Sequence, residues 1–451
     1  MQNLDSLIRN QKMIISVYGL GNVGGPIAAA WLRKGAKVIG IDISDKLLSE
    51  IRSSTSHIKE PFVSDTFTKS LKDRQLILTT DGIDASKNSH VKIVAVPVAF
   101  SNKKINFDAL ISATKNIATG IKKGDAVIIC PSLPPGTTEQ IVLPIIEKSG
   151  LKVERDFYLI YNPERIFEGR ALQDIEENYP AIVAGFGKKS LKFGESLLKI
   201  ISKKGTLTMS SISTAEAEKL FEGVYRDVNI ALANELAIFS QKIGINFWEA
   251  RKGANSQPYC HLHYPGTGVG GLCIPIYPKF IIESAKKIDQ NLKIIEFARL
   301  RNDLMPKECV KNAIDLLTKN KKNTGKKLKI AVLGLGFRGD VTDSRLSPTY
   351  TVVKEFLENG YDVFVHDPLI KNDELLPSSV FLSDKLDEVA ENASLIFIST
   401  DHKMYSKLTK KSFITAKKPL LIFDGRNILN KNNFKDTLVQ TIGIEHHSLR
   451  R

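Results

Sequence analysis

The feature that most constrains the fold is a strand followed by a glycine-rich turn, and it occurs twice. Residues 13–25 read MIISVYGLGNVGG, and residues 329–340 read KIAVLGLGFRGD. An apolar run leading into G-x-G is typical of the first strand and turn of a nucleotide-binding α/β domain. Because one copy stands near the start and the other in the last third of the chain, we expect two domains that each open in this way.

Short β-branched runs separated by helix-length segments follow each glycine turn. After the first turn they lie at 37–42, 91–97 and 125–132, and after the second at 361–368, 393–400 and 419–426. This alternation indicates βαβ units and parallel sheets. The sequence therefore predicts an α/β protein with two Rossmann-like doubly wound domains.

A long helix is expected between the two domains. Ser213 and Glu216 have the spacing of a capping box, and apolar residues follow at helical spacing to about Ile243. These are Leu220, Val224, Val228, Leu232, Leu236 and Phe239. Such an apolar stripe commonly packs against a second copy of the chain, so we expect a homodimer joined through this central helix.

Three segments follow from these boundaries. We expect a dinucleotide-binding domain at 1–205, a central helical region at 206–318 and a second Rossmann-like domain at 325–451. The lysine-rich stretch at 318–329 is interpreted as a solvated linker before the last domain. A chain of 451 residues is long enough for each domain to bury its own core.

Charge and composition narrow the partners. The net charge is +15, but the lysines are scattered and no basic stripe with interleaved aromatics occurs, so we predict no nucleic-acid partner and favour small anionic ligands. No apolar run is long enough for a membrane span, and the first residues do not resemble a secretory signal. Four cysteines cannot form a disulfide framework in so long a chain. We therefore expect reduced thiols, no membrane partner and a cytoplasmic protein.

The first glycine turn predicts an NAD site. Gly19, Gly21 and Gly24 fit G-x-G-x-x-G between a strand and a helix, where backbone N–H groups and the helix N-terminus can hold a pyrophosphate. Asp42 ends the next strand 42 − 19 = 23 positions on. A carboxylate there can accept hydrogen bonds from an adenosine ribose, which favours NAD over NADP.

The second turn, with Gly334, Gly336 and Gly339, has the same spacing in a different context. A polar stretch follows it, and the next strand ends at Asp367, 367 − 334 = 33 positions on rather than about 20. We interpret this domain as a binder of a different nucleotide, or as a lid over the first cofactor.

A glycine-rich loop carries the candidate nucleophile. The segment at 265–273 reads PGTGVGGLC, and such a loop brings backbone amides close to a ligand and favours a reactive Cys273 thiol. Cys260, His261 and His263 lie nearby, but their spacing fits no common zinc site, so we predict no metal. An NAD site with a nucleophilic cysteine suits the oxidation of an aldehyde through a thiohemiacetal to a thioester.

The whole series of motifs resembles the nucleotide-sugar 6-dehydrogenases, which act on UDP-glucose, UDP-N-acetylmannosamine or UDP-N-acetylglucosamine. The resemblance covers residues 13–430 and rests on stretches in family order. They include GLGNVGGPIAA, PSLPPGTTEQ, NPERIFEGRAL, EAEKLFEGVYRDVNIALANELA, PGTGVGGLC, GLGFRGDVTDSRLSPT, STDH and FDGRN. RDVNIALANEL, ERIFEGRAL and STDH resemble the N-acetylhexosamine branch more than the UDP-glucose branch, so the expected substrate is UDP-N-acetylmannosamine or a related UDP-N-acetylhexosamine.

The resemblance implies an activity and roles for individual residues. Members oxidise the C6 alcohol of a UDP-sugar to a carboxylate with two NAD⁺. Cys273 would be the nucleophile, Glu164 the acid/base group for the hydrolytic water, and Lys219 the oxyanion stabiliser. Ser132 and Arg345 would lie at the cofactor. The implied substrate-binding residues are Arg165, Gly270, Gly271, Arg338 and Arg426.

The sequence also departs from the family pattern around this machinery. Tyr277 replaces an aspartate four residues after the cysteine, and Gly223 replaces an asparagine four residues after the lysine. Tyr259 stands where arginine is usual, and Thr267 where the branch has proline. Besides an active dehydrogenase, two alternatives stay open: a regulatory or partner protein that binds NAD and nucleotide sugar, and another NAD-linked reaction such as epimerisation.

Overall fold

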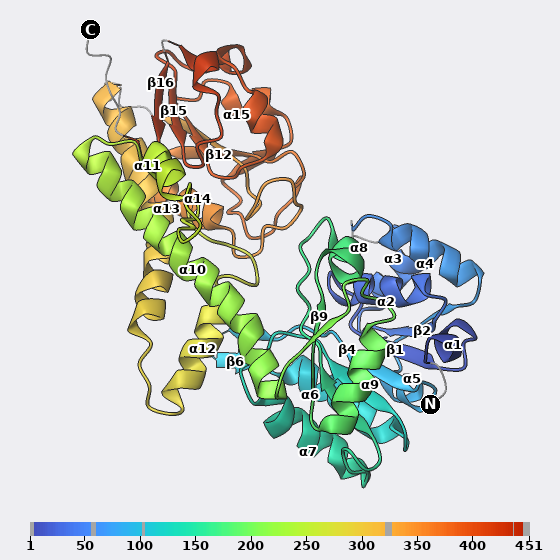
Figure 1. The fold of residues 1–451 in the computed structure, drawn as a ribbon. Coiled ribbons are helices and arrows are strands. Elements are labelled where there is room, and N and C mark those ends of the chain that lie inside the picture. Colours follow the sequence, from blue (N-terminus) through green and yellow to red (C-terminus); the bar gives the residue numbers. More distant parts are fainter. Residues whose placement is uncertain (1–3, 56–59, 102–103, 321–326, 436, 445–451) are drawn as a thin grey trace. The chain divides into compact units, whose positions relative to one another are not determined.

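The computed structural model describes residues 4–55, 60–101, 104–320, 327–435 and 437–444 (Figure 1). The chain divides into two compact units, residues 1–222 and 223–451. Each unit is built around its own parallel sheet. The expectation of an α/β protein with two Rossmann-like domains is therefore confirmed, while the finer division into three segments stays a prediction.

In the described residues, the first unit contains an eight-stranded sheet with the order β10-β9-β8-β7-β4-β1-β2-β3. All neighbours are parallel except β8 and β9. The run from β3 to β8 has the strand order of a dinucleotide-binding fold, with the change of direction between β1 and β4. The strands are β1 (Ile14–Tyr18), β2 (Lys37–Ile41), β3 (Leu76–Thr79), β4 (Val91–Val94), β7 (Ala126–Ile129), β8 (Tyr158–Tyr161), β9 (Ala181–Gly185) and β10 (Thr206–Thr208), with an antiparallel hairpin of β5 (Ala99–Ser101) and β6 (Lys104–Asn106).

Helices cover both faces of this sheet, as the crossover connections of parallel strands require. Alternate strand residues enter two separate buried clusters: Val17 and Ile93 belong to the cluster that includes α2, whereas Ile41 and Val94 belong to the one that includes α6. The helices are α1 (Leu4–Arg9), α2 (Gly24–Arg33), α3 (Asp45–Arg52), α4 (Val63–Lys72), α5 (Gly82–Lys87), α6 (Asp108–Gly120), α7 (Leu143–Ile146), α8 (Ala171–Gln173) and α9 (Lys188–Leu198), with shorter turns η1 (Thr138–Val142), η2 (Glu147–Ser149) and η3 (Asp174–Asn178).

The second unit repeats this plan with an all-parallel sheet, in the order β13-β12-β11-β14-β15-β16 among the residues described. Its strands are β11 (Lys329–Leu333), β12 (Asp362–His366), β13 (Phe381–Ser383), β14 (Leu395–Ile398), β15 (Leu421–Asp424) and β16 (Leu438–Thr441). The helices are α11 (Phe247–Ala254), α12 (Tyr277–Lys286), α13 (Lys293–Asn320), α14 (Pro348–Glu358) and α15 (Leu386–Ala390), with turns η4 (Lys403–Lys407), η5 (Lys410–Phe413) and η6 (Lys431–Phe434). Buried residues of α13 and of the second half of α10 pack on this sheet.

The long central helix is confirmed: α10 runs over Ile212–Ile243 and is the long green helix of Figure 1. The predicted capping box is wrong. Ser211 caps the helix, because its side chain accepts a hydrogen bond from the Thr214 N–H at 3.1 Å. Glu216 is completely buried and binds a loop of the first sheet instead.

The lysine-rich segment at 318–329 is only partly a linker. Helix α13 continues to Asn320, and β11 begins at Lys329. Residues 321–326, the middle of the predicted linker, lie outside the described residues. None of the helices in the described part of the chain combines the length and apolarity needed to cross a bilayer.

Candidate functional site

The first glycine turn joins β1 to α2 and has the geometry of a phosphate-binding turn. Gly19 has φ +88° and donates its N–H to the Ile41 carbonyl at 2.8 Å. A Cβ on Gly24 would lie 1.7 Å from the Gly19 carbonyl oxygen, so this position requires glycine. A Cβ on Gly21 would meet nothing within 4 Å. Close packing thus explains two of the glycines, and Gly21 leaves open space at the start of α2 for a ligand to approach the backbone.

Asp42 lies beside this turn, at the end of β2. Its carboxylate accepts hydrogen bonds from the N–H groups of Leu20 and Ser44, both at 2.9 Å. The side chain remains half-buried, so it has acceptor capacity left for a ribose hydroxyl. The open backbone at Gly21, the helix N-terminus at Gly24 and this accessible carboxylate together fit the pyrophosphate and ribose of NAD.

Glu164 and Lys219 are brought together in the first unit. Glu164 follows β8, Lys219 projects from α10, and the Lys219 Nζ lies 4.0 Å from the Glu164 Oε1. Their side chains are only 12% and 8% exposed, respectively. The other carboxylate oxygen accepts the Ile166 N–H at 2.9 Å, which fixes the carboxylate plane. A buried, oriented carboxylate beside an ammonium suits proton transfer and charge stabilisation.

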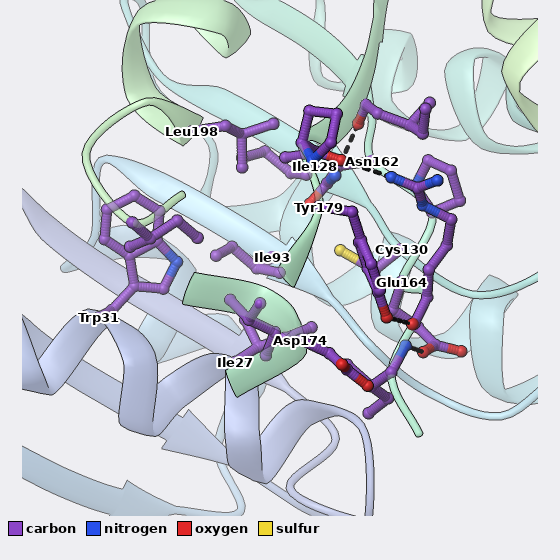
Figure 2. Close-up of a pocket in the computed structure, with 18 residues that line it drawn as sticks. Ile27, Trp31, Ile93, Ile128, Cys130, Asn162, Glu164, Asp174, Tyr179 and Leu198 are labelled. Carbon is purple, nitrogen blue, oxygen red and sulfur yellow. Dashed lines mark hydrogen bonds between the residues drawn. The ribbon is translucent and has the colours of Figure 1, made fainter. Parts of the chain in front are cut away.

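Figure 2 shows a pocket next to this pair, between α2, the sheet and the segment that follows β8. Trp31 lies on one side of it, and Cys130 and Glu164 on the other. Burial, reinforced by the Glu164 carboxylate, raises the pKa of the Cys130 thiol far above its ordinary value. Cys130 is therefore an unreactive thiol. The other lining residues are Ile27, Ile93, Ile128, Asn162, Pro163, Arg165, Ile166, Asp174, Ile175, Tyr179, Pro180, Ala181, Ile182, Leu198 and Ile201.

Arg165 has a structural task that the sequence did not indicate. Its guanidinium donates to the Pro180 carbonyl and lies 4.8 Å from the centre of the Tyr179 ring. The Tyr179 hydroxyl donates in return to the Arg165 carbonyl. Arg165 thus fastens the segment after β8 to the segment before β9, and its predicted contact with substrate stays a prediction.

Glu216 is the residue whose role sequence reasoning missed. Its carboxylate accepts hydrogen bonds from the N–H of Thr138 at 2.8 Å, from the Thr138 hydroxyl at 2.7 Å and from the Gly136 N–H. Burial raises the pKa of this carboxyl to about 7, although those hydrogen bonds favour the ionised form. Glu216 therefore anchors to α10 the loop that follows β7 and carries Ser132. In the sequence, Glu216 lies in EAEKLFEGVYRDVNIALANELA and its partners Gly136 and Thr138 lie in PSLPPGTTEQ, two motifs far apart in the chain.

Cys273 lies in the second unit, at the N-terminal end of α12, and its residue is exposed. Its carbonyl accepts hydrogen bonds from the N–H groups of Ile276 at 3.1 Å and Tyr277 at 3.0 Å, so the cysteine is attached directly to the first turn of that helix. A helix N-terminus favours a negative charge, which suits a thiolate nucleophile.

The glycines before Cys273 are needed to pack the loop on the second Rossmann-like domain. A Cβ on Gly271 would lie 2.9 Å from the Phe337 ring, and one on Gly270 would lie 2.6 Å from the Leu346 carbonyl oxygen. The Gly271 N–H also donates to the Arg345 carbonyl at 3.1 Å. The loop therefore rests on the second glycine turn and on the polar segment after it, and the substrate-binding role of Gly270 and Gly271 stays a prediction.

The three arginines of the second domain are distributed around this contact. Arg426 donates its Nε–H to the Ser399 carbonyl at 2.7 Å and lies against Gly266 of the cysteine loop. Arg345 forms an ion pair with Asp343 at 2.6 Å. Arg338 is half-buried within the glycine turn itself. Guanidinium groups around a glycine turn suit an anionic nucleotide, and the contact of Arg345 with cofactor stays a prediction.

Gly223 and Tyr277, the two residues that depart from the family pattern near the lysine and the cysteine, are in contact with each other. A Cβ on Gly223 would lie 2.3 Å from Cδ2 of Tyr277, a distance that real Cβ atoms do not adopt. Tyr277 is 6% exposed, and Gly223 is buried. The structure therefore shows one steric change where the sequence showed two separate substitutions.

These features define an NAD-dependent dehydrogenase with a second nucleotide-binding domain. Family models agree over most of the chain: residues 13–202 match the NAD binding domain, residues 213–304 the central domain and residues 331–431 the UDP binding domain of one family. The chain belongs to the UDP-glucose/GDP-mannose dehydrogenase family.

Named relatives and solved structures support this assignment. The chain is 33% identical to a UDP-N-acetyl-D-mannosamine dehydrogenase of Pyrococcus horikoshii over 93% of this chain and 96% of the relative. It is 30% identical to an NDP-N-acetyl-D-galactosaminuronic acid dehydrogenase of Ralstonia solanacearum, over 90% and 94% of the two chains. The structure of a UDP-D-ManNAc dehydrogenase from P. horikoshii superposes with a TM-score of 0.87 at 31% identity, covering 96% of this chain and 99% of the other. That of a UDP-N-acetyl-mannosamine dehydrogenase from Staphylococcus aureus gives 0.84 at 29% identity, covering 95% and 98%.

Proposed function

We propose that this protein oxidises the C6 alcohol of UDP-N-acetylmannosamine, or of a related UDP-N-acetylhexosamine, to the uronic acid. The observation that carries the proposal is the combination of an exposed cysteine at the N-terminus of α12 with a buried Glu164–Lys219 pair, in a chain 33% identical over 93% of its length to a UDP-N-acetyl-D-mannosamine dehydrogenase. Alternatives from the sequence, a regulatory protein or an epimerase, are outcomes of the test below.

NAD⁺, when bound at the first glycine turn, accepts a hydride in each of two oxidations. In the first, the C6 alcohol loses a hydride and a proton to become an aldehyde. The Cys273 thiolate then adds to the aldehyde carbon, and loss of a second hydride leaves a thioester on the cysteine. Water cleaves this thioester to the carboxylate and frees the thiol, so that one water is consumed and two NADH are formed.

Glu164 and Lys219 have separate tasks in this proposal. The Glu164 carboxylate, held by the Ile166 N–H, takes a proton from the hydrolytic water. The Lys219 ammonium stabilises the negative oxygen that develops when the carbonyl carbon is attacked. Ser132, at the loop anchored by Glu216, is proposed to lie at the cofactor, and Arg338 and Arg426 to hold the anionic UDP group.

The test is NADH formation by the purified protein with a panel of UDP-sugars, compared with two cysteine variants. Cys273→Ser should lose the second oxidation by about 10³-fold or more, because a serine hydroxyl is a far weaker nucleophile than a thiolate. Cys260→Ser, at another thiol of the second unit, serves as the matched control and should retain full activity. Absence of NADH with every UDP-hexose, together with normal NAD⁺ binding, would favour the regulatory alternative if the UDP-sugars are recovered unchanged and the epimerase alternative if they are converted.

We further propose that the protein is a homodimer joined through α10. Apolar side chains spaced by four or seven residues, and therefore on one face of this helix, are exposed: Phe221 is 59%, Tyr225 53%, Leu232 46% and Phe239 55% exposed. Leu220, part of the stripe predicted from the sequence, is fully buried and does not belong to this face. An apolar face of this length is typical of an interface.

Leu232→Glu should convert the dimer to a monomer in light scattering, because a charge cannot be buried there unpaired. Lys252→Gln, on the exposed side of α11, makes the same change in net charge and should have no effect. A mass of 50.0 kDa for the unmodified protein at micromolar concentration would reject the dimer. A cytoplasmic location belongs to the same proposal, because all four cysteines are thiols and not disulfides, which suits a reducing compartment.

A further inference from the structure

The Gly223–Tyr277 contact joins α10 to the helix that carries the nucleophile. The Tyr277 ring fills the place where a side chain of residue 223 would stand, since a Cβ there would lie 2.3 Å from its Cδ2, 3.1 Å from its Cγ and 3.2 Å from its Cβ. Rotating the ring away would relieve the first two distances but not the third, because Cβ does not move when χ1 changes. A side chain at 223 therefore has to push the first turn of α12 as well as the ring.

That first turn is where Cys273 is attached. The Tyr277 N–H donates to the Cys273 carbonyl at 3.0 Å, and the Ile276 N–H donates to the same oxygen at 3.1 Å. One residue thus contacts α10 through its ring and the cysteine through its backbone. A displacement of Tyr277 therefore reaches the Cys273 carbonyl directly, through the hydrogen bond from the Tyr277 N–H.

The surroundings leave the ring little freedom. Tyr277 is 6% exposed, and Phe280 and Ile281, which follow it on the inner face of α12, are 1% and 8% exposed. Close-packed interiors of this kind transmit a displacement instead of absorbing it. Gly223 lies on α10 and faces the Tyr277 ring, so a change in the spacing of α10 and α12 at this point displaces the turn to which Cys273 is attached.

We propose that Tyr277 is a positioning residue for Cys273, that its ring sets the spacing between α10 and the cysteine turn, and that Gly223 is its obligate counterpart. The role in catalysis rests on the dehydrogenase function proposed above. The role as a spacer does not, and it can be measured in the protein without substrate. A further consequence is that a side chain introduced at 223, an asparagine included, displaces Tyr277.

The first test is amide hydrogen exchange of the peptide that covers 273–280, in the full chain without ligands. Gly223→Ala should increase exchange at the Ile276 and Tyr277 amides by about tenfold or more, because overpacking loosens the turn. The double variant Gly223→Ala/Tyr277→Ala should restore protection to within about threefold of the Tyr277→Ala single variant, because the ring that clashes is gone and the two remaining Cβ atoms, 3.2 Å apart, need only a small shift. Gly253→Ala is the matched control, since a Cβ on this helical glycine of α11 meets nothing within 4 Å.

The second test separates the ring from its hydroxyl and uses activity. Tyr277→Phe keeps the spacer and should retain the exchange pattern of the unmodified protein and a kcat within about threefold of it, whereas Tyr277→Ala should lower kcat by about tenfold or more. The KM for NAD⁺ should stay unchanged in both variants, because the glycine turn and Asp42 that are proposed to bind NAD⁺ belong to the first unit. A general loss of folding would change both constants and the melting temperature.

Two outcomes would overturn the proposal. One is additivity, in which the double variant is as perturbed as the sum of the two single variants. The other is equal behaviour of Tyr277→Phe and Tyr277→Ala, which would assign the role to the hydroxyl. If the exchange results agree with the proposal but the unmodified protein forms no NADH, the proposed function fails while the spacer role of Tyr277 stands.

Discussion

The two glycine turns, at 19–24 and 334–339, begin in the same way. Gly19 donates its N–H to the Ile41 carbonyl at 2.8 Å, and Gly334 donates to the His366 carbonyl at 2.7 Å. In both, the next residue donates to the aspartate that ends the neighbouring strand. Asp367 therefore occupies the same place in its domain as Asp42, although it lies ten residues further from its turn.

The two aspartates differ in how much of their hydrogen-bonding capacity the fold consumes. Asp42 is half-buried and accepts two backbone N–H groups. Asp367 is fully buried and accepts from four: Leu335, Gly336, Leu369 and Ile370, at 2.8–3.0 Å. His402 adds a fifth contact at 3.2 Å, and because its other ring nitrogen accepts the Asp340 N–H, the nitrogen facing Asp367 carries the proton. Asp42 is left available to a ligand, whereas Asp367 is committed to the fold.

The third glycines differ as well. Gly24 begins α2, so a helix N-terminus stands at the first turn. A Cβ on Gly339 would lie 2.2 Å from the Asp401 carbonyl oxygen, and the next helix, α14, begins only at Pro348. The same spacing of glycines therefore serves a dinucleotide in one domain and close packing in the other. What decides the ligand is whether the carboxylate and the helix N-terminus remain accessible.

The largest expected effect comes from exchanging the aspartates for alanine. Asp367→Ala leaves buried N–H groups and His402 without an acceptor and should lower the free energy of unfolding of the second domain by about 3–5 kcal/mol. Asp42→Ala exposes its two N–H groups to water and should cost about 1 kcal/mol. Urea unfolding of both variants measures this. Equal losses of stability would contradict the distinction between a structural and a binding carboxylate.

The open space at Gly21 gives the next prediction. Gly21→Ala should leave the fold unchanged, because its Cβ meets nothing within 4 Å, but weaken NAD⁺ binding by about 100-fold by blocking the approach of the pyrophosphate. The matched variant is Gly336→Ala, whose Cβ would lie 3.2 Å from the Arg338 carbonyl oxygen. It should leave NAD⁺ affinity unchanged in a fluorescence titration. Similar losses of NAD⁺ affinity in both variants would show that the two turns share a ligand.

The sequence predicted what depends on local pattern. The strand, turn and helix around Gly19, with Asp42 at a standard distance, are all short-range features, and the α/β alternation of both domains follows from periodicity. The number of residues between Gly334 and Asp367 was misleading, because it suggested that Asp367 has no counterpart in the first domain. The extra residues lie in the polar segment between Gly339 and α14 and do not change the position of the aspartate in the fold. Sequence distance is a poor guide wherever a loop is inserted.

The features that the sequence could not predict depend on contacts between distant segments. Glu216 anchors a loop 78 residues earlier through Thr138, and a local capping pattern concealed that role. Gly223 and Tyr277 appeared as two independent departures until the ring was found over the glycine. Side-chain packing of this kind is decided by tertiary structure, and no local propensity encodes it.

A smaller effect is expected on the choice of cofactor. Asp42 should accept from the ribose 2′-hydroxyl of NAD⁺ and repel the 2′-phosphate of NADP⁺. Asp42→Ala should therefore narrow the preference for NAD⁺ by about tenfold, which corresponds to one hydrogen bond and the loss of one repulsion. Titration of both cofactors measures the ratio. An unchanged ratio of the NAD⁺ and NADP⁺ affinities would show that Asp42 does not discriminate between the cofactors. Its role would then be structural, like that of Asp367.

The smallest expected effect is on the pH dependence of stability. It is seen by comparing Asp367 with another buried aspartate of the same sheet, Asp424 at the end of β15. Burial acts to raise the pKa of both carboxyls. In Asp367 the hydrogen bonds from His402 and the backbone outweigh it, so the pKa is lowered from 3.8, whereas in Asp424 burial prevails over backbone hydrogen bonds and the pKa is raised.

These opposite shifts predict opposite pH dependences. A lowered folded-state pKa contributes stability that is present above the unfolded value and lost as pH falls through the folded value, so Asp367→Asn should flatten the loss of stability in acid by about 1 kcal/mol. A raised pKa contributes stability that is present below the unfolded value and lost as pH rises, so Asp424→Asn should steepen the acid loss. Urea unfolding between about pH 6 and pH 3 distinguishes the two. Parallel curves of unfolding free energy against pH for the two variants would mean that His402 does not hold Asp367 ionised. The structural role of Asp367 would then depend only on its hydrogen bonds to the backbone.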